Sequence, residues 1–391
     1  MRSSSYLAPA LCILLFATCA EPPTAPENLV SPEAPLFKPK CDSPPCDGGE
    51  DPPEDPPPPP PSADQEILYS DFSRDFGSVS IFRMNVDGSN VEPVFGDDVE
   101  SGNDNTHPAW APDGERLTFT RLVRVLDKKK VVSTSHQIAV GRDDGTGPTV
   151  IREVPGGSVE PLYRPRWSPA PVGGVERIAW VENRWDAGQA VVVVARTDTW
   201  DVETLLTSGL DEHFGNMTWS RTGEQILVEG WYESSQQSFL RLYDVDCSVS
   251  CTATPAGDLS LSPLSSNDGF MHVDWAHLHD WVLVPAIPAG ESFGDLWLID
   301  MTTGDLHRVT QTSIDVQDAV WSSCDDAILI GVWGQFGRQW SNKLIRLNLA
   351  GLPAVTPWDG SLDDPTIAEE VADVGTTGIA GIDWRPTPCG S

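Results

Sequence analysis

The sequence has few basic residues. Its 391 residues contain 25 lysines and arginines against 58 aspartates and glutamates, which gives a net charge of −33. The acidic excess extends over the whole chain, since residues 65–391 alone carry 48 acids and 22 bases. A surface of this sign repels phosphates, so the composition excludes nucleic acid as a partner. The acids are expected to keep the protein soluble, and binding of a cation or a basic partner is the alternative.

Catalytic motifs are scarce as well. No G-x-S-x-G elbow follows the repeats described below, no room remains for a hydrolase domain, and no glycine-rich phosphate loop or H-E-x-x-H pair occurs. Acidic pairs such as Asp143-Asp144 and Asp325-Asp326 lack EF-hand spacing and suit turns between strands. The sequence therefore assigns no catalytic residue, metal or cofactor.

A long apolar run occurs only at the N-terminus, where Arg2 precedes the segment Leu7–Ala17. The run is too short to span a membrane and is typical of an export signal, here residues 1–18. The letters FATC, which end at Cys19, resemble a bacterial lipobox with Cys19 as the acylated residue. This resemblance implies an outer-membrane lipoprotein that faces the periplasm or the cell surface. Cleavage after Ala20, without a lipid, is the alternative.

Residues 19–64 are rich in proline and acids and include the six-proline run Pro56–Pro61. Such a segment cannot bury a core, so an extended, disordered tether is predicted. At about 3.1 Å per residue, it could hold a folded domain on the order of 130 Å from a membrane.

Tryptophan is abundant, with 15 residues, and six of these recur in one pattern. The clearest copy is HPAWAPDGERLTFTR, His107–Arg121, in which a proline-aspartate-glycine turn follows the tryptophan and an alternating strand follows the turn. The repeat tryptophans are Trp110, Trp167, Trp219, Trp275, Trp321 and Trp384. They lie 46 to 63 residues apart. A repeat of short strands with roughly this period is typical of a β-propeller.

The two ends of the repeat region complement each other. The last unit stops after the strand that ends at Trp384, whereas the region opens with strands that no tryptophan hairpin precedes, beginning with Glu66–Asp71. Joining the ends completes one blade and removes exposed sheet edges. We therefore predict an all-β fold over residues 65–391: a six-bladed propeller of four-stranded blades, one blade closed by strands from both termini.

The segments WAPDGERLTFTR and IFRMNVDGSN resemble the repeats of TolB-type propellers. The resemblance covers Glu66–Pro388 and implies a TolB-like propeller. Other copies depart from the turn motif, as at Ala276–Asp280 and Ser322–Asp326, and the α/β domain of TolB has no counterpart in this sequence.

Six cysteines remain after export, because Cys12 leaves with the signal and Cys19 is lipidated or removed. An even set in an exported chain indicates disulfides, and the spacings do not match a four-cysteine zinc site. The pairs expected are Cys41 with Cys46, Cys247 with Cys251, and Cys324 with Cys389. The last pair occupies similar corners of neighbouring blades, and two free buried thiols are the alternative.

A candidate ligand site follows from the register of the repeats. The first strand of each propeller blade lines the axis, so residues three positions before the tryptophans should converge at one mouth of the channel. Five of these six positions are polar: His107, Arg164, Asn216, His272 and Asp318, with Gly381 as the sixth. A neighbouring residue, His213, could join them. The alternative is that these side chains satisfy backbone groups or line a wet channel.

The function expected is a non-enzymatic binding or scaffolding module of the cell envelope, acting as a monomer on an envelope protein or a glycan. The lipid on Cys19 would attach it to the membrane. The enzymatic alternative rests on resemblance to oligogalacturonate lyases, propellers that use channel histidines around a metal. His107, His272 and His213 could imitate those histidines.

Overall fold

The computed structural model describes residues 66–72, 79–95, 103–127, 130–155, 160–184, 188–260, 264, 272–288, 290–349, 357–375 and 378–389. Within these ranges all regular structure is β-strand, and 24 strands form six four-stranded sheets. No helix of the described residues is long and apolar enough to span a membrane. The predictions on the export signal, Cys19, Cys41, Cys46 and the tether lie outside the described residues and stay predictions.

Each sheet is one antiparallel blade. Blade 1 contains β4 (Asp104–Trp110), β5 (Arg116–Asp127), β6 (Lys130–Arg142) and β7 (Thr149–Pro155). Blade 2 contains β8 (Glu160–Trp167), β9 (Arg177–Arg184), β10 (Gln189–Arg196) and β11 (Val202–Thr207). Blade 3 contains β12 (Glu212–Trp219), β13 (Gln225–Tyr232), β14 (Ser238–Asp246) and β15 (Thr252–Asp258).

The remaining blades follow in the same order. Blade 4 contains β16 (Asp274–Trp275), β17 (Trp281–Ala286), β18 (Asp295–Asp300) and β19 (Leu306–Arg308). Blade 5 contains β20 (Asp315–Trp321), β21 (Ala327–Phe336), β22 (Gln339–Asn348) and β23 (Ala368–Gly375). Blade 6 combines β24 (Ile379–Trp384) with β1 (Glu66–Phe72), β2 (Val79–Asn85) and β3 (Glu92–Pro93).

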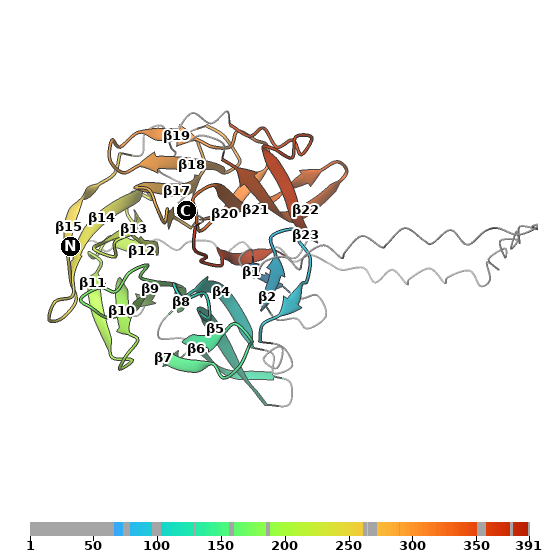
Figure 1. Ribbon diagram of the computed structural model, residues 1–391. Coiled ribbons are helices and arrows are strands. Elements are labelled where there is room, and N and C mark those ends of the chain that lie inside the picture. Colours follow the sequence, from blue (N-terminus) through green and yellow to red (C-terminus); the bar gives the residue numbers. More distant parts are fainter. Residues whose placement is uncertain are drawn as a thin grey trace, which may run out of the picture. The chain divides into compact units, whose positions relative to one another are not determined.

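The blades close into a ring, as Figure 1 shows. The first strand of each blade contacts the first strand of the next, and β24 of blade 6 contacts β4 of blade 1. In blade 6, β1 pairs with β24 on one side, with Ile67 opposite Trp384, and with β2 on the other. The six-bladed ring and the blade built from both termini are therefore confirmed.

The apolar core consists of six separate clusters, each between two neighbouring blades. A middle strand packs against a blade on each side, which explains the unbroken apolar run Ala190–Ala195 of β10, buried on both faces. The outermost strand β15 is largely exposed and polar. Burial is thus greatest in the middle strands of the blades, less in the first strands, and least in the outermost strand.

Tight turns join the first two strands in blades 1, 3, 4 and 5. In blade 1, Gly114 has a φ of 67°, in the left-handed region, and a Cβ there would lie 3.2 Å from the carbonyl oxygen of Pro386. The turn therefore needs glycine for its backbone conformation and for its contact with the C-terminal segment.

Candidate ligand-binding channel

The residue three positions before each repeat tryptophan lies in an irregular part of the first strand. Pairing shifts by one or more residues around this position in five blades. His107, Arg164 and His272 have φ values of 52°, 45° and 61°, and Gly381 at the equivalent position has 124°. A left-handed backbone costs a non-glycine residue about 1–2 kcal/mol. Strain repeated at equivalent positions is a signal of a functional site.

Side chains from opposite blades meet at this level of the channel. Nη1 of Arg164 donates to Oδ1 of Asp318 at 3.5 Å, and Nη2 of Arg164 donates to Nδ1 of His272. His272 Nδ1 also lies 3.0 Å from Asp318 Oδ1. Arg164 belongs to blade 2 and Asp318 to blade 5, which face each other in a ring of six, so this pair bridges the channel.

His107 and Gly381 complete one side of the same layer. The edge of the His107 ring packs on His272, with centroids 6.4 Å apart and ring planes at 83°. A Cβ on Gly381 would lie 2.8 Å from the Cα of His107, so a larger residue there would push His107 away. The absence of a side chain at Gly381 is thus what lets His107 reach its place.

Two of the predicted residues also bind the backbone. Asn216 Oδ1 accepts the N–H of Met217 at 2.8 Å. Asp318 Oδ1 accepts the N–H of Ala319 at 2.9 Å, and Oδ2 accepts the N–H of Ile382 in blade 6 at 3.2 Å. The alternative that these side chains satisfy backbone groups therefore holds for Asn216 and Asp318.

The register thus brings His107, Arg164, His272 and Asp318 together, with Asn216 buried in the same layer. Arg164 and Asp318 are buried inside the channel, 4% and 1% exposed, whereas His107 and His272 are half-buried. We call these five residues the inner layer. Their role in ligand binding stays a prediction.

His213 lies apart from the inner layer. Its ring stacks on Trp231 with centroids 5.2 Å apart, and its Nε2 lies 3.3 Å from Oε2 of Glu233. Trp231 and Glu233 lie at the end of β13 and just beyond it, so His213 belongs to the hairpin side of blade 3.

Burial sets the charges of the inner layer. Burial, with Arg164 nearby, lowers the pKa of His272 to about 4 and the pKa of His107 well below its ordinary value, so both rings are neutral at pH 7. Burial also lowers the pKa of Arg164, to about 10, which still leaves it charged. Burial opposes ionisation of Asp318, but the adjacent His272 and Arg164 hold its pKa well below the ordinary value. The bridge across the channel is therefore an ion pair beside two neutral imidazoles.

A second layer, which sequence reasoning missed, lies one residue before four of the six repeat tryptophans. Asp383 Oδ2, Asp274 Oδ2 and Thr218 Oγ1 each accept the backbone N–H of the next blade's tryptophan, at 2.5, 3.0 and 3.3 Å. These bonds fasten blade 6 to blade 1, blade 4 to blade 5 and blade 3 to blade 4. Nη1 of Arg166, at the same position of blade 2, lies 3.4 Å from Asp383 Oδ1. We call these four residues the entrance layer. In the sequence, these residues could have been recognised as side chains able to form hydrogen bonds directly before a repeat tryptophan.

A cavity of about 80 Å³ opens at the entrance layer. Its walls are the four entrance-layer residues and five of the six repeat tryptophans, and Arg221, His277 and Pro386 lie at its rim. Because a strand rises about 3.3 Å per residue, this cavity lies about 7 Å along the axis from the inner layer. Several water molecules or one small polar group would fit.

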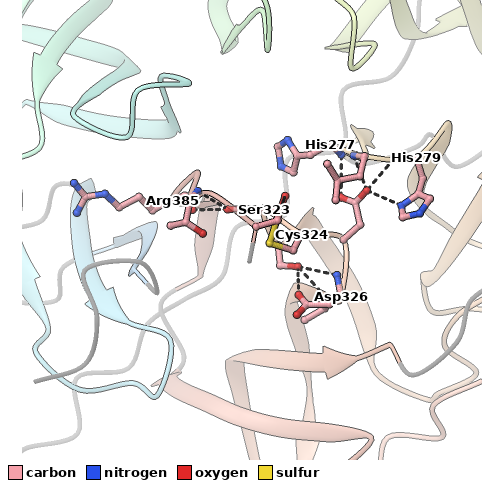
Figure 2. Close-up of a disulfide and its surroundings, with 12 residues drawn as sticks. His277, His279, Ser323, Cys324, Asp326 and Arg385 are labelled. Atoms are coloured by element: carbon pink, nitrogen blue, oxygen red, sulfur yellow. Dashed lines mark hydrogen bonds and ion pairs between the residues drawn. A yellow bond between two sulfur atoms is a disulfide. The ribbon is translucent and has the colours of Figure 1, made fainter. Parts of the chain in front are cut away.

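A disulfide stands beside this rim. Cys324 in blade 5 is bonded to Cys389 in the C-terminal segment, as the sequence predicted, with Cα atoms 5.4 Å apart. Figure 2 shows the polar contacts around it: the Ser323 hydroxyl donates to the carbonyl oxygen of Arg385 at 2.7 Å and accepts the N–H of Thr387 at 3.0 Å. The C-terminal segment is therefore fastened where it forms the cavity rim. A second predicted disulfide, Cys247–Cys251, closes a short loop in blade 3.

The fold and the channel define a six-bladed propeller with a polar core at its axis. TolB of Acinetobacter baumannii superposes on it with a TM-score of 0.56 at 14% identity, covering 83% of this chain and 67% of that one. A TolB candidate from Agrobacterium tumefaciens gives 0.50 at 12% identity, covering 83% and 99%. Hydrazine synthase of Kuenenia stuttgartiensis gives 0.57 at 9% identity, covering 82% of this chain and 46% of that one.

At these identities the likeness shows the fold alone, a six-bladed propeller similar to those of the TolB structures. An oligogalacturonate lyase in complex with manganese overlaps with a TM-score of 0.44, too little to bear on activity. No protein-family model matches the chain, and no curated protein matches it.

Proposed function

We propose that the chain is a non-enzymatic binding or scaffolding module of the bacterial cell envelope, which presents its propeller to a protein or glycan partner. The observation that carries the proposal is the cavity at the channel entrance. Its polar walls are held in place by hydrogen bonds between blades, so the site is formed before any ligand arrives. A preformed site binds without the cost of ordering side chains.

The position in the envelope rests on residues 1–64. An export signal, a lipobox-like FATC and a proline-rich tether are the parts of an anchored module. In this proposal Cys19 carries the lipid, the tether provides reach, and the propeller works as a monomer.

Several features favour binding over catalysis. The letters G-E-S-F-G at Gly290–Gly294 match the nucleophile pattern, but Ser292 is exposed in the loop between β17 and β18 and no helix follows it. His213 lies away from His107 and His272. Within the described ranges no group of three or more histidines, cysteines, aspartates or glutamates could hold a metal ion.

The test is capture of a partner from envelope extract by the tagged propeller. We expect a discrete protein or an enriched glycan, and weaker capture by the rim variant Arg221→Ala/His277→Ala. The matched control is Leu210→Ser, which changes an exposed residue near the start of β12, at the opposite end of that strand from the cavity. Capture that is equal for the rim variant and wild type would contradict the proposal. Metal-dependent cleavage of polygalacturonate would favour the lyase instead.

A further inference from the structure

The ionisable groups around the channel axis contain more acids than bases. Arg164 and Arg166 face Asp274, Asp318, Asp383 and Glu229, while the two histidines of the inner layer are neutral. The bridge between Arg164 and Asp318 is complete in itself. Asp274 and Asp383 share Arg166 as their compensating cation, and Glu229 has only Arg164, which is already paired with Asp318.

Among the acids of the entrance layer, Asp274 has the least compensation by nearby cations. Its Oδ2 accepts one backbone N–H, but among the described residues no lysine, arginine or histidine lies within ion-pair distance of its carboxylate. Asp383 contacts Arg166 only at 3.4 Å. Oε2 of Glu229, a side chain that is 6% exposed, has no hydrogen-bond partner in the described part of the chain. Burial raises the pKa of Asp274, of Asp383 to about 7, and of Glu229 to about 8, as expected for acids that lack compensating charge.

Both aspartates line the cavity, and the cavity is open. Burying a carboxylate costs free energy unless a cation is paired with it. A cation that enters from solvent would supply the pairing that the protein's own residues do not give these aspartates.

We propose that the entrance cavity binds one ammonium or guanidinium group, carried by a lysine or arginine of a basic protein partner, between Asp274 and Asp383. This inference rests on the proposed function and specifies its ligand. The cavity is lined by Asp274 and Asp383 together with Arg166 and Arg221, and Arg221 is paired with Asp280, which does not line the cavity. About 80 Å³ suits the end of a basic side chain. The net charge of −33 would speed the approach of such a partner.

The experiment titrates the exported chain with the peptide acetyl-Gly-Lys-Gly-amide and follows calorimetry and the fluorescence of the cavity tryptophans. We expect saturable binding, at least tenfold weaker for the same peptide with an acetylated lysine amine. We also expect proton release near pH 7, measured in buffers of different ionisation enthalpy, because the bound cation lowers the pKa of Asp383.

Two substitutions should act in opposite directions. Asp274→Asn removes the charge but keeps an oxygen for the tryptophan N–H, and should weaken binding at least tenfold. Arg166→Gln removes a competing cation and should strengthen it severalfold. Asp258→Asn, in the exposed outer strand of blade 3, changes the net charge equally and should leave binding unchanged.

Equal binding of the acetylated peptide, or binding of inorganic phosphate in its place, would overturn the inference. If Asp274→Asn fails to fold, Arg166→Gln decides, since unchanged affinity there also overturns it. Partner capture that depends on the rim residues would still support the proposed function when the lysine peptide fails, so the two failures are distinguishable.

Discussion

Arg164 is a buried cation, and its negative partner, Asp318, belongs to the opposite blade of the propeller. Arg164→Met leaves Asp318 charged and without its partner. Asp318→Asn leaves Arg164 charged and without its partner. Breaking a buried pair costs about 3–5 kcal/mol, and each single variant should lose about this much free energy of unfolding. The double variant should lose clearly less than the sum of the two. Denaturant unfolding of wild type, the two single variants and the double variant measures the coupling energy. Strictly additive losses would show that the Arg164–Asp318 bridge contributes no coupling energy.

Because of Asp383, we expect the free energy of unfolding to depend on pH with the opposite sign to that of a carboxylate in an ordinary salt bridge. Burial raises its pKa from 3.8 to about 7 in the folded protein, although Arg166 acts against this. The folded state therefore holds a proton that the unfolded state has released. The stability from this proton is complete below pH 3.8 and is lost as pH rises toward 7.

Asp383→Asn should therefore gain stability relative to wild type as pH rises from 4 to 7. At about 1.4 kcal/mol per unit of pKa, the gain is at most about 4 kcal/mol. Unfolding free energies of both proteins between pH 4 and pH 8 give this difference, and other titrating groups cancel because they are common to both. Parallel curves would refute the assignment.

The inner layer was accessible from the sequence because one repeat register fixes equivalent positions. The left-handed backbone at His107, Arg164 and His272 was not, since no pattern of residue types requires it. The entrance layer was missed for a related reason. Asp274 and Asp383 act on the backbone of the neighbouring blade, and a repeat pattern describes one blade at a time.

At the level of elements, the tryptophan, the turn and the alternating strand were enough to predict the blades. The copies that depart from proline-aspartate-glycine show what replaces that turn. In blade 4, the N–H groups of His277, Leu278 and His279 all donate to the carboxylate of Asp325 in blade 5. A turn with Leu278 in place of the motif aspartate is held by an aspartate from the next blade, an exchange that the sequence of a single copy cannot reveal.

The two disulfides should differ in their effect on stability. Cys324–Cys389 spans 65 residues and Cys247–Cys251 spans four. In the chain-entropy model the longer loop stabilises by roughly 4 kcal/mol and the shorter by roughly 2 kcal/mol. Replacing each pair by serine should therefore lower the unfolding free energy more for Cys324 and Cys389. Denaturant unfolding under oxidising conditions is the measurement, and an equal or reversed order would show that local contacts outweigh loop length.

At the level of the whole molecule, the N-terminal segment predicts where the propeller works. If Cys19 is acylated, Cys19→Ala should release the protein into the soluble fraction and abolish labelling by a fatty-acid analogue. Fractionation and labelling in the producing cell test this, with Cys12→Ala as a control inside the export signal. Membrane partitioning that is unchanged in Cys19→Ala would contradict the anchor.

Closure of the ring is the property on which all six blades depend. Each apolar cluster lies between two blades, so an open ring exposes the faces on both sides of the gap. The strand β24 supplies Ile382 and Trp384 to one such cluster and pairs with β1. Deleting Ile379–Ser391 therefore removes buried apolar surface, leaves β1 as an unpaired edge and takes away Cys389.

The truncated protein should lose cooperative unfolding and aggregate, because neighbouring blades stabilise one another only while the ring is closed. Circular dichroism during heating measures the transition. Cys389→Ser is the matched control: it breaks the same disulfide but keeps the strand, and should lower the melting temperature while preserving a single transition. If the truncation behaved like Cys389→Ser, the disulfide would account for the whole effect and β24 would contribute nothing to closure. An unchanged melting temperature in the truncated protein would refute the closure itself.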